Sequence, residues 1–304
     1  MKSIKFMTLT AVTTLLLSSC GTTQTVPLTG RTHRISVSDE QVLSLSNQEY
    51  TKYMASAKKS TNATNTAMVQ RVGKRLATAV ETYLKNNGFA NDVKNCQWEF
   101  NLVQDNSANA FCMPGGKIVV YEGLLPYTQN ETSLAIVLGH EIAHAVAKHS
   151  AEQLTKQQNQ QTGTSILGTV LNQAVGSGVG NVASAVAGQY FSFRNLKYSR
   201  DNETEADYMG LIFAAMAGYD PQQAIPFWQR MSQGKSSNQS DIFSDHPSDA
   251  KRIAALQQEM PEALKYYKPQ TTTSSASKTT TAKKTTTKKT TTAKKTTAKK
   301  SSKK

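Results

Sequence analysis

The spacing of hydrophobic positions predicts helices for much of the chain and a small sheet near its middle. Five apolar residues recur at helical spacing before a glycine end signal at Asn87-Gly88: Val69, Val72, Leu76, Val80 and Leu84. Residues 97–103 alternate between apolar and polar, as a half-buried strand does. Short apolar runs on both sides of residues 114–116 (Pro-Gly-Gly) predict a hairpin, because proline sets one backbone angle and glycine tolerates positive φ. We therefore expect an α+β fold that is mainly α-helical, with a small antiparallel sheet.

A further helix is expected to carry the apolar stretch AIVLGHEIAHAVAKHS, residues 135–150. Thr128 and Glu131, three positions apart before this stretch, form a capping-box pattern that predicts where the helix starts. We expect the helix to end within residues 149–154. Because it is apolar on most sides, its few polar side chains would be buried and would need partners.

Three of these polar residues have the spacing of half a metal site. Residues four apart on an α-helix differ by about 40°, so His140 and His144 point the same way and can chelate one metal ion. Glu141 lies roughly 100° further round, where it can accept a proton from a water molecule that the metal activates. The pattern H-E-x-x-H also occurs by chance. By itself it leaves open whether this is a zinc site or a helix that merely carries two histidines.

A catalytic zinc site needs a third protein ligand and one open position. The pattern with a third histidine six residues after His144 fails, because that position is Ser150. His149 is about 140° from His144 on a continuous helix, so we expect it off the metal face, in a helix-end or hydrogen-bonding role. The third ligand must then come from another part of the chain.

The segment SRDNETEAD, residues 199–207, predicts a helix with acidic residues one turn apart. Glu203 and Asp207 share a face, so Glu203 can bind the metal while Asp207 hydrogen-bonds a ligand imidazole and fixes its orientation. Glu205, roughly 200° from Glu203, is expected to face away. The alternative, a charged face toward solvent, fits Asp201, Glu205 and to a lesser degree Asp207.

Four motifs, taken together, resemble the M48 family of zinc metallopeptidases. They are His140-Glu141-Ile142-Ala143-His144, the segment SRDNETEAD, Asn109-Ala110-Phe111 with Pro114-Gly115-Gly116, and His246-Pro247. The motifs stand in family order and the resemblance covers about residues 45–260. It implies a gluzincin-like fold with an edge strand beside the active-site helix. It also implies one zinc ion per chain, held by His140, His144 and Glu203, with Glu141 transferring the proton.

Among family members, the chain most resembles the periplasmic lipoproteins that act in outer-membrane quality control. Members that cross the membrane several times carry clear transmembrane helices, and longer periplasmic members add a helical-repeat domain. We expect a member of the lipoprotein type without a C-terminal helical-repeat domain.

Further residues are expected to act at the site. The extended segment from Asn109 to Phe111 is expected to bind substrate as an edge strand through backbone hydrogen bonds, although a plain structural hairpin is the alternative. His246 is expected to act as an oxyanion donor or an inhibitory fourth zinc ligand, against a loop histidine that caps a helix. Arg252 is expected to pair with Asp207 or with substrate.

The two ends of the chain do not resemble a folded domain. Residues 1–19 have a basic start, an uncharged apolar run and small residues, and resemble a bacterial lipoprotein signal that is cut before Cys20, the acylated residue. An ordinary signal peptide that contains a cysteine is the alternative. We expect residues 20–40 to form a tether, residues 41–268 the zinc metallopeptidase domain, and residues 269–304 a disordered tail rich in threonine and lysine.

The basic charge of the chain comes from this tail. Of 35 Lys and Arg residues, 11 lie in the tail and 2 in the signal, which leaves 22 against 21 Asp and Glu residues. The charge therefore gives no support for specific binding of nucleic acid. The tail is expected to contact anionic lipid or envelope polymers, or to serve as a flexible spacer.

Two internal features leave alternatives open. If Cys20 carries lipid, Cys96 and Cys112 are either a disulfide or two buried free thiols. Residues 157–193 contain no charged residue, but glycine and polar residues interrupt any run long enough to span a membrane. We expect two packed helical pieces there, or a flap near the site.

The sequence predicts a lipid-anchored, zinc-dependent endopeptidase of the bacterial cell envelope that hydrolyses unfolded or misassembled envelope proteins in quality control. We expect it on the periplasmic side of the outer membrane, since glycine follows the cysteine and no acidic run is near. The alternative is a latent or chaperone-like zinc-binding envelope protein with little proteolytic activity. Four protein ligands instead of three would favour that alternative.

Overall fold

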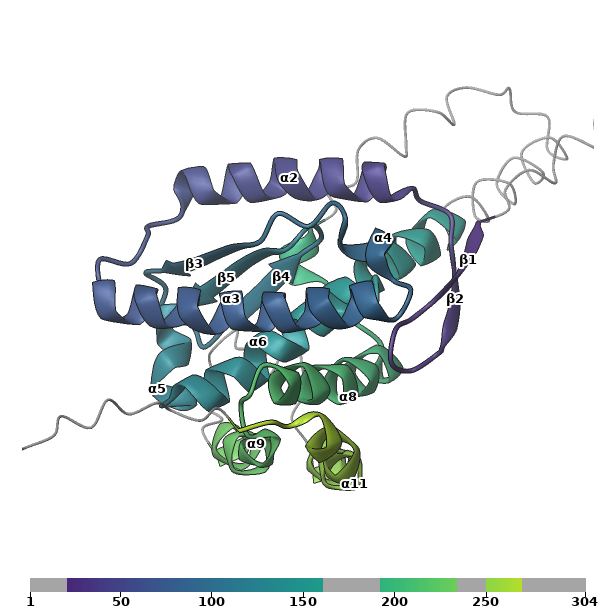
Figure 1. The fold of residues 1–304 in the computed structure, drawn as a ribbon. Helices are drawn as coiled ribbons and strands as arrows, with labels where there is room; N and C mark the ends of the chain where they lie inside the picture. Colours follow the sequence, from purple (N-terminus) through teal and green to yellow (C-terminus); the bar gives the residue numbers. More distant parts are fainter. Residues whose placement is uncertain (1–20, 161–191, 234–249, 270–304) are drawn as a thin grey trace, which may run out of the picture. The chain divides into compact units, whose positions relative to one another are not determined.

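The helix that carries the H-E-x-x-H pattern lies at the centre of the fold, between a small sheet and helix α8 (Figure 1). The computed structural model describes residues 21–160, 192–233 and 250–269, which belong to one compact unit, Met1–Pro269. The named elements are β1 (Thr22–Thr25), β2 (Thr32–Ile35), α2 (Asp39–Ser56), α3 (Ala63–Asn86), α4 (Ala90–Val93), β3 (Glu99–Val103), β4 (Ala110–Met113), β5 (Lys117–Tyr121), η2 (Glu122–Leu124), α5 (Leu125–Thr128), α6 (Glu131–Val146), η3 (Phe193–Asn195), α8 (Arg200–Met216), η4 (Pro221–Gln223), α9 (Ala224–Gln233) and α11 (Ala250–Tyr266). The mainly helical α+β class expected from the sequence is confirmed.

The three-stranded sheet is mixed, and this corrects the antiparallel sheet expected from the sequence. Its strand order is β3-β5-β4; β4 pairs antiparallel with β5, but β3 pairs parallel with β5. The predicted hairpin at residues 114–116 is confirmed as the β4–β5 turn, where Gly115 and Gly116 both have φ of 85°. Alternation along one strand cannot reveal which strands pair, because pairing joins residues that are distant in sequence. Strand β4 is left at the edge of the sheet and contacts α6.

Helix α6 starts at a different cap from the one expected. The N-cap is Asn130, whose side-chain oxygen accepts a hydrogen bond from the backbone amide of Ser133 at 2.8 Å. The predicted capping box of Thr128 and Glu131 is therefore wrong: Thr128 ends the short helix α5. Gln129, with a left-handed φ of 62°, separates the two helices and presents Asn130 to the first turn of α6.

Helix α6 also ends earlier than expected. It stops at Val146 instead of within residues 149–154, and Lys148 adopts a left-handed φ of 53° before the helical residues 149–160. The Lys148 ammonium lies 3.0 Å from Asp39 of α2 and 3.1 Å from Asp92 of α4. Glycine is the usual residue in this left-handed conformation, and these ion pairs stabilise the conformation for Lys148. They also connect α2 and α4 to the end of α6.

The segment expected to be a tether, residues 20–40, forms a packed hairpin over its described part. Strand β1 pairs antiparallel with β2, and Val26 and Ile35 are each only 1% exposed. Arg31 of the turn forms an ion pair with Glu205 of α8 at 2.7 Å. A threonine-rich composition broken by proline and glycine is shared by linkers and tight hairpins, so the sequence could not separate them.

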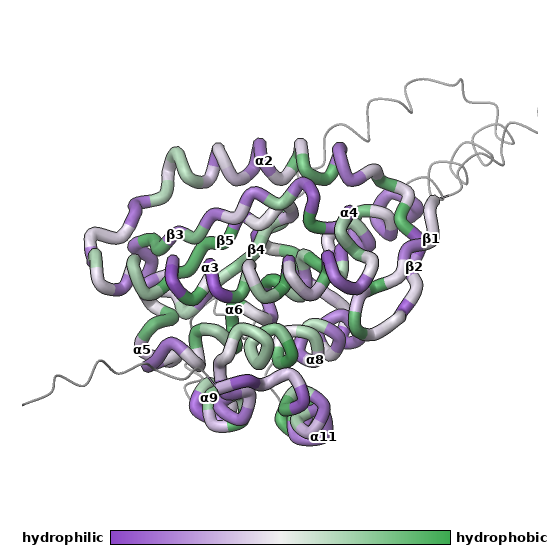
Figure 2. The backbone as a smooth tube through the Cα atoms, in the orientation of Figure 1, coloured by the Kyte–Doolittle hydropathy of each residue, from purple (hydrophilic) through white to green (hydrophobic). Residues whose placement is uncertain are grey.

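Hydrophobic residues concentrate on the central elements (Figure 2). Helix α6 and the central strand β5 are mostly hydrophobic, whereas α2 is mixed. Apart from Glu131, Thr132 and Ala145, all residues of α6 are buried. The polar side chains near the middle of this helix are therefore enclosed by packed apolar residues. Within the described ranges, no helix combines the length and the hydropathy needed to span a membrane.

Candidate active site

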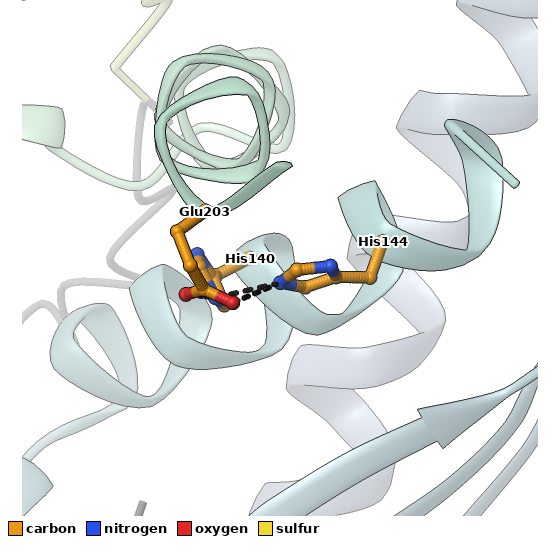
Figure 3. Close-up of side chains that lie close together, drawn as sticks. All are labelled: His140, His144 and Glu203. Atoms are coloured by element: carbon orange, nitrogen blue, oxygen red, sulfur yellow. Dashed lines mark hydrogen bonds and ion pairs between the residues drawn. The ribbon is translucent and has the colours of Figure 1, made fainter. Parts of the chain in front are cut away.

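Two histidines of α6 and one glutamate of α8 converge on a single point (Figure 3). The Nε2 atoms of His140 and His144 lie 3.1 Å apart. The carboxylate of Glu203 reaches both rings: its Oε2 lies 3.5 Å from Nε2 of His140, and its Oε1 lies 3.5 Å from Nε2 of His144. Both histidines are buried and Glu203 is partly buried. The structure thus brings together the three residues that the sequence indicated as metal ligands.

The spacing of the two ring nitrogens and the Glu203 carboxylate fits a tetrahedral metal site. Ligands bound about 2.1 Å from a tetrahedral zinc ion lie about 3.4 Å from one another, close to the 3.1 Å between the two Nε2 atoms and the 3.5 Å from each of them to one oxygen of Glu203. Two imidazole nitrogens and one carboxylate oxygen also suit zinc, whereas calcium and magnesium prefer oxygen ligands alone. The residues present therefore fit a zinc ion.

A pair of glycines lets α6 and α8 approach closely at this site. A Cβ atom on Gly139 would lie 2.6 Å from the backbone oxygen of Gly210, and a Cβ atom on Gly210 would lie 2.6 Å from the backbone nitrogen of His140. Neither position has room for a side chain. The close crossing brings Glu203, two turns before Gly210, within reach of both histidines.

A buried ion pair holds the other ring nitrogen of His140. Its Nδ1 lies 2.9 Å from Oδ1 of Asp207, and Nη2 of Arg252 lies 2.5 Å from the same oxygen. The Arg252 guanidinium stacks over the Trp228 ring at 3.5 Å. Burial opposes protonation of His140, but the hydrogen bonds with Asp207 and Glu203 outweigh it and raise the pKa of His140 to about 9. Asp207 thus lies within hydrogen-bond distance of His140, as the orienting role requires. Of the two partners expected for Arg252, Asp207 and substrate, the structure shows Asp207.

Glu141 is buried beside the ligands but is not one of them. Its side chain lies on the same helix and only 3% of the residue is exposed. Burial, together with the charge of Glu141, raises the pKa of Cys112 well above its usual value. Burial and the same charge also raise the pKa of Tyr198. The Glu141 carboxylate therefore lies close enough to Cys112 of β4 and to Tyr198 to influence their ionisation.

Tyr198 is a site residue that the sequence reasoning missed. Its ring stacks on His144 with the centroids 4.1 Å apart and the planes inclined by 19°. Its hydroxyl lies 2.9 Å from the hydroxyl of Ser150. Tyr198 therefore fixes the plane of one ligand ring. The only signal in the sequence is an aromatic residue directly before the N-cap Ser199, and this is not specific.

His149 and Glu205 form a hydrogen-bonded contact behind the site. Nδ1 of His149 lies 2.9 Å from Nδ1 of His144, and its Nε2 lies 2.9 Å from Oε2 of Glu205. The expected hydrogen-bonding role of His149 is confirmed. The alternative of a charged solvent face is wrong for Glu205, which is 8% exposed. Burial opposes its ionisation, but hydrogen bonds from His149, Arg31 and Thr29 outweigh it and lower the pKa of Glu205 to about 2.

A comparison with protein-family models agrees with this geometry. The model of peptidase family M48 matches residues 63–260, which is more than half of the chain and includes every candidate metal ligand. The chain belongs to peptidase family M48. This confirms the family expected from the four motifs and, with it, the metallopeptidase class.

Curated relatives of two kinds are similar to this M48 chain. Mitochondrial metalloendopeptidase OMA1 of Arabidopsis thaliana is 41% identical over 173 residues, which cover 56% of this chain and 34% of that protein. The same-named protein of Schizosaccharomyces pombe is 38% identical over 176 residues, covering 55% and 48%. Beta-barrel assembly-enhancing protease of Escherichia coli is 32% identical over 171 residues, covering 54% and 34%. The chain thus spans about a third to about half of the length of these relatives.

The segment expected to bind substrate belongs to the edge strand of this M48 fold. Asn109 precedes β4, and Ala110 and Phe111 are the first residues of the strand. All four residues of β4 are buried, and the Phe111 side chain lies in the core. Asn109 accepts a hydrogen bond from the amide of Tyr121 in β5. The alternation of an antiparallel ladder then directs the backbone groups of Ala110 and Cys112 away from β5.

Several expected features of this M48 chain lie outside the described residues. They are the signal 1–19, Cys20, His246, most of the stretch 157–193, and the tail from residue 270. The other two cysteines are described, and both Cys96 and Cys112 are free thiols. Of the two alternatives for this pair, the structure therefore has the free thiols.

Glu259 of α11 is expected to make the stability of this M48 domain depend on pH. Burial and the negative charge of Asp207 raise the pKa of Glu259 from 4.5 to about 7. A carboxyl group whose pKa is higher in the folded state binds its proton more tightly there, so its contribution to stability is full below pH 4.5 and is lost as the pH rises through about 7. We expect Glu259→Gln to raise the Tm above pH 7 and to leave it unchanged below pH 4.5, measured by thermal unfolding.

The matched control for this prediction is Glu262→Gln on the same helix. Glu262 pairs with Lys265 at the surface, 2.5 Å away, and its substitution is expected to give no such rise in Tm at neutral pH. A Tm difference between wild type and Glu259→Gln that is the same at acid and neutral pH would contradict the prediction.

Proposed function

We propose that this protein is a zinc-dependent endopeptidase of the bacterial cell envelope that hydrolyses peptide bonds of unfolded or misassembled envelope proteins. One observation carries the proposal: His140, His144 and Glu203 converge as three ligands, and a further buried carboxylate, Glu141, lies beside them. Three protein ligands are typical of a catalytic zinc site, whereas structural sites use four. Membership of the M48 family supports the same class of reaction.

Each residue of the site has a role in this chemistry. Bound zinc supplies a Lewis acid that polarises a peptide carbonyl and lowers the pKa of water toward neutrality. His140 and His144 would hold the metal through Nε2, and Asp207 orients the His140 ring through Nδ1. Because Glu203 serves as a ligand, Glu141 is the carboxylate beside the ligands that can act as the base. It accepts a proton from the attacking water and passes it to the leaving amine.

The edge strand supports a preference for unfolded substrates. An extended peptide could add to β4 through the Ala110 carbonyl and the backbone groups of Cys112, which the antiparallel register directs away from β5. The Ala110 amide already donates to Oδ1 of Asn109. Such pairing recognises the backbone of the substrate and not its side chains, so the selectivity for a particular substrate sequence is weak. It also requires the substrate to be extended, which a folded protein seldom offers.

The sequence of the N-terminus supports a place in the cell envelope. Residues 1–19 resemble a lipoprotein signal, and lipid on Cys20 would anchor the protein to the periplasmic side of the outer membrane. The names of the relatives do not decide the compartment, because mitochondrial and bacterial proteins are both similar to the chain. The lysine-rich tail supports contact with anionic lipid or polymers of the envelope.

The test is cleavage of a reduced, alkylated protein by the purified full chain, before and after removal of metal. We expect the unfolded substrate to be cut internally while its native form is spared. A chelator should abolish cleavage, because the three ligands bind the metal reversibly, and stoichiometric zinc should restore it. Magnesium, which prefers oxygen ligands, should not.

Two outcomes would contradict this proposal. Cleavage that persists in the fully metal-free protein would exclude the metal from the reaction. A protein that binds zinc and suppresses aggregation of the unfolded substrate, but does not cut it, would instead be the latent or chaperone-like zinc protein.

A further inference from the structure

The two ligand histidines differ in what supports their second ring nitrogen. For His140 the partner is a carboxylate, Asp207, which lies 2.9 Å from Nδ1. For His144 the partner is another imidazole, His149, also at 2.9 Å, and a carboxylate follows only behind it. His149 is 1% exposed. The support of His144 is therefore a chain of two bonds, shielded from solvent.

The hydrogen atoms of this chain have one consistent arrangement when a metal is bound. A metal on Nε2 of His144 leaves the ring proton on Nδ1, where it is donated to Nδ1 of His149. His149 then carries its own proton on Nε2 and donates it to the Glu205 carboxylate. Every donor meets an acceptor, and the chain ends on a negative charge. Such a chain fixes the tautomer and the ring orientation of the ligand.

The left-handed turn before His149 makes this contact possible. On a continuous helix, residues five apart differ by about 140° and do not meet. The φ of 53° at Lys148 breaks the helix between His144 and His149. The ion pairs of Lys148 with Asp39 and Asp92 hold this turn in place.

The N-terminal hairpin holds the carboxylate at the end of the chain. Nε of Arg31 donates to Oε2 of Glu205 at 2.8 Å, and the hydroxyl of Thr29 donates to its Oε1 at 2.6 Å. Both residues lie in the turn between β1 and β2. Together with His149, they give Glu205 three hydrogen-bond partners from two parts of the chain.

We propose that His149, Glu205 and Arg31 are positioning residues for the ligand His144, so that the N-terminal hairpin is a working part of the metal centre. The inference rests on the proposed function in that a metal binds at His144. It extends that function by assigning the hairpin, which precedes the region matched by the family model, a role in metal affinity. The hairpin acts through Glu205 and His149.

The structure offers a matched pair of substitutions to test this. Glu152 also binds the hairpin, at 3.1 Å from Arg31 and 3.2 Å from His33, but its described hydrogen bonds do not include His149. Glu152→Gln therefore loosens the hairpin while leaving His149, Glu205 and Arg31 all present, whereas Glu205→Gln removes the charge at the end of the chain. Zinc affinity is measured in both full-length variants by competition with a chromophoric chelator.

We expect Glu205→Gln to weaken zinc binding about 10–100-fold, the usual effect of losing a group that orients a metal ligand, and Glu152→Gln to weaken it far less. The visible spectrum of bound cobalt(II) should change in Glu205→Gln and stay as in wild type in Glu152→Gln, because only the former alters a ligand ring. If Glu205→Gln fails to fold, Arg31→Gln replaces it, with the same expected direction.

Equal loss of zinc affinity in Glu205→Gln and Glu152→Gln would overturn the inference, since the hairpin would then act through folding alone. Unchanged affinity and an unchanged cobalt spectrum in Glu205→Gln would also overturn it. If wild type binds zinc and cleaves while Glu205→Gln binds zinc equally well, only this inference fails. If wild type binds no zinc, the proposed function fails with it.

Discussion

Glu141→Gln is expected to lower the rate of cleavage of an unfolded protein by about 10²–10⁴-fold, the usual contribution of a general acid–base group, and to leave bound zinc unchanged. The amide has nearly the shape of the carboxylate but cannot accept the proton. The ligand atoms of His140, His144 and Glu203 lie within 4.8 Å of one another without Glu141, so metal binding should persist. Cleavage is followed with a reduced, alkylated substrate, and zinc is measured by mass spectrometry.

The control for this substitution lies on the same helix. Glu131 pairs with Arg71 in the first turn of α6, about two and a half helical turns before His140. Glu131→Gln should leave both cleavage and zinc content as in wild type. If Glu141→Gln binds zinc and cleaves as fast as wild type, Glu141 is not the base and the proposed mechanism is wrong.

Glu203→Gln is expected to lose zinc, with an affinity reduced by more than the roughly 10–100-fold that loss of an orienting group costs. The carboxylate supplies the one ligand atom that α6 cannot provide, and only 12% of its side chain is exposed. Cleavage should be lost together with the metal. Zinc should also no longer raise the Tm, because a ligand stabilises the folded state only in proportion to its binding.

Asp201→Asn serves as the control for Glu203→Gln. Asp201 is an exposed residue in the first turn of the same helix, and its substitution should change neither zinc affinity nor the rise in Tm on addition of zinc. A Glu203→Gln protein that binds zinc as tightly as wild type would show that the third ligand comes from elsewhere in the chain.

The part of the site that could be predicted from the sequence is the part set by helical geometry. His140 and His144 share a face because four residues make about one turn, and the same rule places Glu203 and Asp207 together. The structure adds that Asp207 reaches His140 at 2.9 Å. Burial in an apolar helix indicated a functional cluster, since uncompensated polar groups are costly to bury.

The parts that could not be predicted depend on contacts between distant segments. Alternation predicted β3, and apolar runs on both sides of a turn predicted β4 and β5, but the parallel pairing of β3 with β5 joins strands that are separated by β4. Tyr198 gave no signal, because its role depends on stacking against His144. The capping box at Thr128 failed because Thr128 ends helix α5, and the left-handed Gln129 then places Asn130 at the N-cap of α6.

By itself, the sequence predicted the face that His140 and His144 share, because one helix turn sets their spacing. Its four motifs predicted the family and, with it, the metallopeptidase class. Only the tertiary structure decided what lies behind that face. The sequence alone is compatible with Glu205 as a surface charge, but in the structure Glu205 is buried and pairs with Arg31 of the hairpin. The helical period places His149 off the metal face, and only the turn at Lys148 brings its ring to Nδ1 of His144. Burial and hydrogen bonding of a charged group depend on which segments pack over it, and no local period of the sequence carries that information.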